Sequence, residues 1–180
     1  MNALQKFVCR LLTVVPVFVL GYCPLSHAQE FDSRIASVFL INFAKQVQWP
    51  PQSSSGDFVI GVVGNSSIIS ELKGNSLQVK INGRTIIVKP LGAQALPSEW
   101  KACHMVFVGK AETKALSGLS DTLGDAPVLV VGEGEGQKGS TINLFINKIE
   151  GRPKFELSRV TLEKHGLKAT AMLLNLAVAI

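Results

Sequence analysis

The pattern of hydrophobic and polar positions predicts a long amphipathic helix at residues 34–50, RIASVFLINFAKQVQWP. Large side chains recur there at three- and four-residue steps, the spacing that places them on one helix face. Asp32 or Ser33 can cap the start, and Pro50 and Pro51 can stop the helix. We expect this face to be buried and the helix to be structural. The predicted face consists of Ile35, Val38, Phe39, Asn42, Phe43, Gln46 and Val47.

Three short, wholly apolar runs predict buried strands at residues 58–63, 104–108 and 128–131. Runs of this kind are typical of strands that are covered on both faces, as in a parallel sheet. Helical patterns separate them at residues 66–72 and 112–119. The alternation predicts an α/β fold with a mostly parallel central sheet and helices on both faces.

A β-hairpin is predicted where Asn82 and Gly83 separate two β-rich runs. Both turn residues tolerate the positive φ angles that a two-residue hairpin turn requires. We expect the two strands at residues 77–81 and 84–88, followed by an irregular segment at residues 90–97.

The C-terminal part of the chain follows a different pattern. Apolar residues alternate at residues 141–147, and a returning strand is predicted at residues 154–157, so the two form an antiparallel hairpin. Helices are predicted at residues 158–164 and 169–180. The hairpin and these two closing helices complete the predicted fold.

The first residues read as a secretory signal peptide. A positively charged start precedes an apolar run at residues 11–20, and Ser26 and Ala28 then place small residues at the two positions that a signal peptidase reads. A retained membrane anchor is the alternative, but this run is shorter than the ~20 residues that a spanning helix needs. We therefore expect cleavage between Ala28 and Gln29.

Removal of residues 1–28 takes away Lys6, Arg10 and no acidic residue, so 16 basic and 13 acidic residues remain. This net charge of +3 is scattered rather than clustered, which gives no support to nucleic-acid binding. Residues 29–180 are expected to form a single α/β domain. Export without an anchor predicts a periplasmic location in a host with two membranes.

The expected mature chain keeps one cysteine, Cys103, because Cys9 and Cys23 leave with the signal. One cysteine cannot form an intramolecular disulfide, so the core must provide the stability. Cys103 is then either buried and inert, or a redox-active thiol available for pairing between chains in a homodimer. The sequence leaves these alternatives open.

A glycine-rich stretch at residues 134–139 matches the nucleotide-binding pattern G-x-G-x-x-G. A strand is predicted to follow it, whereas phosphate binding requires the start of a helix there. Glu133 and Glu135 would also repel a phosphate. We therefore expect a flexible surface loop and no nucleotide cofactor.

No set of residues indicates catalysis or metal binding. His104 and Cys103 are neighbours in a predicted strand, so their side chains point to opposite faces. His165 lies at a predicted helix end, where a partial charge would complement the dipole. Glu150 and Glu156 are expected at solvated positions of the hairpin. The residues indicate a binding or interaction domain without enzymatic activity, cofactor or metal.

The order of several sequence blocks is similar to that of the YfiR-like family of bacterial periplasmic proteins, over residues 33–180. The blocks are VFLINFAKQVQWP, FVIGVVG, INGRTIIV, CHMVFVG, VLVVGEG, GSTINLFI, GRPKFELS and HGLKATAMLLNLA. The resemblance implies a non-enzymatic periplasmic regulator. Better-known members bind the periplasmic sensor part of an inner-membrane diguanylate cyclase and repress it, which affects cyclic-di-GMP and biofilm formation. Other relatives accompany different membrane signalling proteins, so a sensor kinase is an alternative partner.

Two departures from the family pattern qualify this resemblance. The chain has Gly139, Ser140 and Thr141 where members often have two glycines and a methionine. Cys103 matches a family cysteine but lacks its intramolecular partner, so no disulfide switch within one chain is expected. An alternative function is a small-ligand sensor, with loops at residues 64–67 and 109–112 gathered at the carboxyl ends of the strands.

Overall fold

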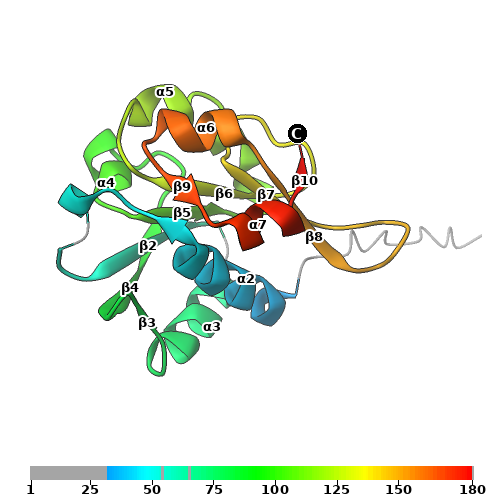
Figure 1. Ribbon diagram of the computed structural model, residues 1–180, viewed down its shortest axis with the longest axis horizontal. Helices are drawn as coiled ribbons and strands as arrows, with labels where there is room; N and C mark the ends of the chain where they lie inside the picture. The colour runs from blue at the N-terminus through cyan, green and yellow to red at the C-terminus, as the bar shows by residue number, and fades with distance from the viewer. Residues whose placement is uncertain (1–31, 54, 65, 180) are drawn as a thin grey trace, which may run out of the picture. The chain divides into compact units, whose positions relative to one another are not determined.

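A computed structural model describes residues 32–53, 55–64 and 66–179 of the 180-residue chain (Figure 1). The helical elements are α2 (Ser33–Gln46), η1 (Pro51–Ser53), α3 (Ser66–Ser76), α4 (Pro97–Lys101), η2 (Lys110–Leu116), α5 (Leu119–Leu123), α6 (Arg159–Lys164) and α7 (Ala171–Leu176). The strands are β1 (Val47–Gln48), β2 (Phe58–Val63), β3 (Lys80–Ile81), β4 (Arg84–Leu91), β5 (Met105–Val108), β6 (Leu129–Glu133), β7 (Ile142–Ile146), β8 (Pro153–Leu157), β9 (Lys168–Ala169) and β10 (Val178–Ala179).

The main sheet has eight strands in the order β10-β8-β7-β6-β5-β2-β4-β3. Strands β4, β2, β5, β6 and β7 are mutually parallel, while β8 returns antiparallel to β7 and β3 is antiparallel to β4. Strands β1 and β9 form a separate antiparallel pair. The predicted α/β class, the mostly parallel sheet and the C-terminal hairpin are confirmed.

Two hydrophobic clusters cover the two faces of the sheet, because alternate side chains of a strand point to opposite sides. On one face, α2, α3, α6 and α7 pack over strand residues such as Ile60, Phe107 and Val131. On the other face, α4, η2 and α5 pack over residues such as Val106 and Val130. The prediction of helices on both faces is therefore correct.

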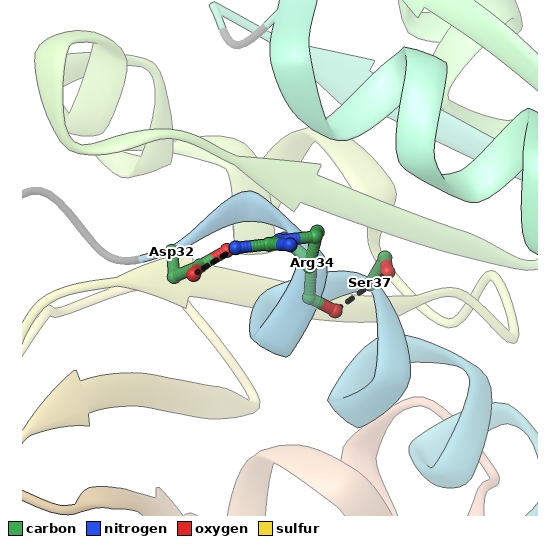
Figure 2. Close-up of polar contacts among 3 residues, drawn as sticks. All are labelled: Asp32, Arg34 and Ser37. Atoms are coloured by element: carbon green, nitrogen blue, oxygen red, sulfur yellow. Dashed lines mark hydrogen bonds and ion pairs between the residues drawn. The ribbon is translucent and has the colours of Figure 1, made fainter.

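Helix α2 starts as predicted but ends earlier. The Asp32 carboxylate caps it by accepting a hydrogen bond from the Arg34 backbone N–H at 2.9 Å, and its Oδ2 lies 3.5 Å from the Arg34 guanidinium (Figure 2). The predicted end at residue 50 is wrong, because Val47 is already extended and pairs with Ala169. Pairing with a distant strand therefore ends the helix before Pro50 does.

The buried face of α2 also differs from the predicted one. Ile35 and Val38 are 40% and 53% exposed, and Asn42 is exposed as well. Phe43 and Val47 are buried as predicted, but the other residues of the buried face differ from those predicted. This face consists of Ala36, Ser37, Leu40, Ile41, Phe43 and Ala44. The Ser37 hydroxyl donates to the Arg34 carbonyl (Figure 2) and accepts from Asn75 Nδ2 of α3 at 2.9 Å.

The predicted hairpin turn is confirmed, since Asn82 and Gly83 have φ angles of 50° and 79°. Its first strand is shorter than predicted because α3 continues to Ser76 and leaves Leu77 88% exposed. Strand β4 instead runs beyond its predicted end to Leu91, because β2 pairs with it along six residues.

The helix predicted at residues 112–119 is two elements, η2 and α5. Gly118 separates them with a φ of 78°. Leu116 and Leu119 are both buried, as their spacing indicated, but they belong to different elements.

The two closing helices are present, but the second one is much shorter than predicted. Ser158 caps α6 by accepting from the Thr161 N–H, and Gly166 follows the helix with a φ of 63°. In place of the single helix predicted at residues 169–180, the structure has three consecutive elements, β9, α7 and β10. Both ends became strands because β9 pairs with β1 and β10 pairs with β8.

Candidate functional site

The loops that follow β2, β5 and β6 meet at the carboxyl edge of the parallel strands, as predicted. A Cβ added at Gly64 would overlap the side chain of Glu112, so these two loops are in direct contact. The Gly109 N–H donates to the Val63 carbonyl at 2.9 Å. Crevices at this edge are the usual ligand-binding positions of open α/β sheets.

A buried carboxylate holds the glycine-rich loop at this edge. The Glu156 Oε2 accepts hydrogen bonds from the Gly136 N–H at 2.8 Å and from Asn143 Nδ2 at 2.9 Å. Glu156 is 7% exposed and Asn143 is 1% exposed. The Ser140 hydroxyl lies within hydrogen-bonding reach of Asn143 Oδ1 and of the Gln137 carbonyl. The prediction that Glu156 is a solvated residue is wrong.

A second buried carboxylate, Glu133 at the end of β6, ties the start of the same loop to η2. It is 5% exposed, and its Oε2 accepts from the Lys110 backbone N–H at 3.0 Å. Gly139 has a φ of 88°, and a Cβ there would overlap the Leu116 carbonyl oxygen. The loop is therefore anchored by side chains and by close backbone packing, contrary to the flexible loop that we predicted.

A pocket of about 470 Å³ lies between η2 and the glycine-rich loop. Its lining comes from Thr113, Leu116, Ser117, Gly118 and the loop residues Gly136, Gln137, Lys138 and Gly139. The predicted binding loops at residues 64–67 and 109–112 do not line it. The sequence signal that could have located this pocket is the glycine spacing, which we interpreted only as a failed nucleotide motif.

At the opposite, amino edge of the parallel strands, Arg84 holds the loop that precedes β2. Its Nε donates to the Gly56 carbonyl at 2.7 Å and its Nη1 to the Ser53 carbonyl at 2.9 Å. Its Nη2 donates to the carbonyls of Ser55 and Asp57 at 3.2 and 2.8 Å. Desolvation is the main reason that the Arg84 pKa is lowered, but arginine stays protonated at neutral pH.

His104 forms part of the same cluster as a neutral ring. Its Nδ1 accepts from the Val59 N–H at 3.1 Å, so its proton is on Nε2, which lies 3.1 Å from the Ser53 carbonyl. Arg84 Nη2 is 2.8 Å from this Nε2. Burial, and then the Arg84 charge, lower the His104 pKa. The ring stacks on Phe58 with centroids 4.9 Å apart.

The other predicted residues do not join either edge cluster. Cys103 is 4% exposed, its Sγ donates to the Glu99 carbonyl at 3.4 Å, and burial raises its pKa to about 11. A thiol of this kind is a poor nucleophile. His165 does end α6, but it is fully buried and burial lowers its pKa, so the expected positive charge at the helix end is wrong.

The predicted cleavage point at Ala28 and Gln29 lies outside the described residues.

Among residues that are described, no cluster of three or more histidine, cysteine or acidic side chains could hold a metal ion. The helices of the same part of the chain are all too short or too polar to cross a membrane. Glu133, Glu156 and Arg84 each form hydrogen bonds with backbone groups of neighbouring loops or elements, so their arrangement stabilises loops.

Comparison with solved structures supports the fold. A conserved domain protein from Vibrio cholerae O1 biovar El Tor has a TM-score of 0.57 and 13% sequence identity. The match covers 82% of this chain and 60% of that one, so the chain spans less than two thirds of the length of that protein. At this identity the similarity concerns the fold alone.

Comparison with sequences is more specific about the family. No curated protein matches the chain. The model of the YfiR/HmsC-like family matches residues 33–178, which include every helix and all but the last residue of the strands described above. This match covers far more than half of the sequence. The chain therefore belongs to the YfiR/HmsC-like family.

Proposed function

We propose that this chain is a non-enzymatic periplasmic regulator, exported by a signal peptide that is cleaved between Ala28 and Gln29. Residues 29–180 would then be the mature domain. It binds the periplasmic sensor part of an inner-membrane diguanylate cyclase, or of a sensor kinase, and represses it. The observation that carries this proposal is the family match over residues 33–178.

The described side chains support a role in binding. The charged groups of the two edge clusters are directed at backbone N–H and carbonyl groups, and the buried thiol of Cys103 has a raised pKa of about 11. Loops ordered in this way lose little conformational entropy on binding a partner. Repression by contact needs such a surface and no reacting group.

The first test measures cyclic-di-GMP in a strain that lacks the gene, complemented with the full chain. We expect a higher level in the deletion strain and restoration by the complementing gene. The control strain carries the candidate cyclase without its periplasmic part, where the deletion should have no effect. An unchanged cyclic-di-GMP level, with no binding of residues 29–180 to the periplasmic parts of neighbouring cyclases or kinases, would contradict the proposal.

Small-ligand sensing is the second candidate function. The observation in its favour is the pocket of about 470 Å³ beside the glycine-rich loop, at the edge where such sheets bind ligands. A ligand raises the melting temperature because it binds only the folded state. A thermal-shift survey of periplasmic metabolites tests this function, and its failure across a broad panel would count against it.

A further inference from the structure

A second pocket, of about 480 Å³, lies between α6, β9 and α7. Its size falls within the range of about 300–1,000 Å³ that is usual for small-molecule sites. Its walls come from elements that are consecutive in the chain, namely α6 from its first residue, the Gly166 turn, β9 and α7.

The floor of this pocket is apolar and continuous with the main core. Leu162 and Leu167 are 3% and 1% exposed and belong to the larger hydrophobic cluster. Ala169 and Leu174 are half-buried and pack against that cluster. An apolar body placed over these four side chains would leave water, which favours binding.

The rim of the pocket is charged, with a net positive balance. Arg159, Glu163 and Lys168 line it and are exposed. In the described parts of the chain, none of these three is in an ion pair. The ion pairs found there are Arg34–Asp32, Lys154–Glu150 and Lys164–Asp121. Two cations thus remain available above an apolar floor, against one carboxylate.

We propose that this pocket binds a small amphipathic carboxylate, with its anionic head at Arg159 and Lys168 and its apolar body over Leu162, Leu167 and Leu174. Charge-assisted hydrogen bonds from arginine and lysine to a carboxylate are among the stronger polar contacts. Glu163 disfavours a dianion or a larger anionic head. This site goes beyond the proposed regulatory function, and its binding test does not depend on that function.

The position of the pocket connects it to the N-terminal helix. Ala169 lines the pocket and pairs with Val47, directly after α2. The Thr170 hydroxyl, which caps α7, also donates to Gln46 Oε1 at 2.6 Å. A bound carboxylate therefore stabilises the junction at which α7 and α2 are joined.

Octanoate is the probe for the first experiment, because it combines a carboxylate with an apolar chain. Octylamine is the control with the opposite charge, and acetate is the control without an apolar body. We expect octanoate to raise the melting temperature in a saturable manner and both controls to have no saturable effect. Equal stabilisation by octylamine or by acetate would overturn the proposal, as would no saturable effect of octanoate.

Variants and methyl NMR locate the site. The double variant Arg159→Gln/Lys168→Gln should fold normally, because both side chains are exposed, and should bind octanoate roughly tenfold more weakly. Lys148→Gln removes an exposed charge elsewhere and should leave affinity unchanged. Octanoate should shift the methyl resonances of Ala169 and Leu174 but not those of Leu116 in the other pocket. Unchanged affinity of the double variant, or shifts confined to Leu116, would overturn the assignment.

Anionic phospholipid vesicles provide the last arm, because a lipid also combines an anionic head with apolar chains. Vesicles of mixed phosphatidylglycerol and phosphatidylcholine should not compete with octanoate for Arg159 and Lys168. If vesicles bound through these two residues and octanoate did not bind, the proposal of a small soluble ligand would be contradicted.

Discussion

The two edges of the parallel sheet order their loops with charged side chains of opposite sign. At the amino edge, the Arg84 guanidinium donates to four backbone carbonyls. At the carboxyl edge, Glu156 and Glu133 accept from backbone N–H groups of other elements. Among the residues that the structure describes, none of these three side chains is in an ion pair. The comparison shows that one charged side chain, buried like Glu156 or half-buried like Arg84, can fix a loop when backbone dipoles satisfy it.

The two edges differ in the kinds of groups that stabilise their loops. The carboxyl edge combines buried carboxylates, the Asn143 amide and glycines whose backbones pack closely. The amino edge combines the arginine with a titratable ring, His104, which is kept neutral. We therefore expect the first to be sensitive to residue size and hydrogen-bond loss, and the second to be sensitive to pH.

Glu156→Ala should have the largest effect, because it removes the acceptor of the Gly136 N–H and one of the two acceptors of the buried Asn143 Nδ2, the other being the Gln137 carbonyl. We expect the free energy of unfolding to fall by about 3 kcal/mol, measured by urea denaturation. Glu135→Ala, on an exposed side chain of the same loop, is the control and should change stability by less than about 0.5 kcal/mol. Equal effects of the two variants would show that Glu156 does not hold the loop.

Gly139→Ala should destabilise the carboxyl edge by about 2.5 kcal/mol, because the new Cβ combines an unfavourable positive φ with overlap on the Leu116 carbonyl. Gly136→Ala is the matched control, since Gly136 has a φ of 66° but open space around it. That variant should cost only about 1 kcal/mol. Thermal denaturation of both measures the difference, and similar costs would argue against close packing at Gly139.

Arg84→Lys tests the amino edge with the charge retained. A lysine cannot reproduce the fork that donates to several carbonyls, so we expect a loss of about 2 kcal/mol in the free energy of unfolding. Arg152→Lys, at an exposed arginine, should be close to neutral. If Arg84→Lys were also neutral, the charge alone would account for the contribution of Arg84.

The pH dependence should separate the two edges further. Because the folded-state pKa of His104 is lowered below the usual 6.5, the unfolded chain binds the proton more readily. The stability from the neutral ring is present above about pH 6.5 and is lost as the pH falls toward the folded-state pKa.

His104→Asn should cost about 1 kcal/mol at pH 7, since its Oδ1 can still accept from Val59. It should also reduce the loss of stability between about pH 6.5 and 5, measured by urea denaturation across that range. A residual slope is expected from His165, whose pKa is lowered as well. A pH profile identical to that of the parent protein would contradict the role given to His104.

Local patterns were sufficient to predict most of the architecture. Apolar runs identified the central strands, and Asn82 with Gly83 identified the hairpin turn. Helix ends were wrong at Val47 and Ala169, because the pairing of these two residues across the chain overrides local helical preference. The spacing of apolar residues along the sequence contains no information on which distant residues will pair.

The edge clusters could not be predicted because their partners are distant in sequence. Glu156 alternates with outward positions in the hairpin, and only the packing of the glycine-rich loop over β8 buries it. Arg84 begins an unremarkable strand, and its acceptors are carbonyls of a loop that precedes it by 27 to 31 residues. Because every residue has a backbone carbonyl, the sequence does not indicate which carbonyls will accept hydrogen bonds from Arg84.

Residue-resolved amide hydrogen exchange tests the central claim most directly, namely that each loop is held by the charged or polar side chains at its own edge. The Gly136 N–H, in the glycine-rich loop, reports on Glu156, and the Val59 N–H, at the start of β2 directly after the other loop, reports on His104. We predict that Glu156→Ala accelerates exchange at Gly136 and not at Val59, and that His104→Ala does the reverse. Acceleration at both amides by either variant, or continued protection of Gly136 in Glu156→Ala, would contradict this account.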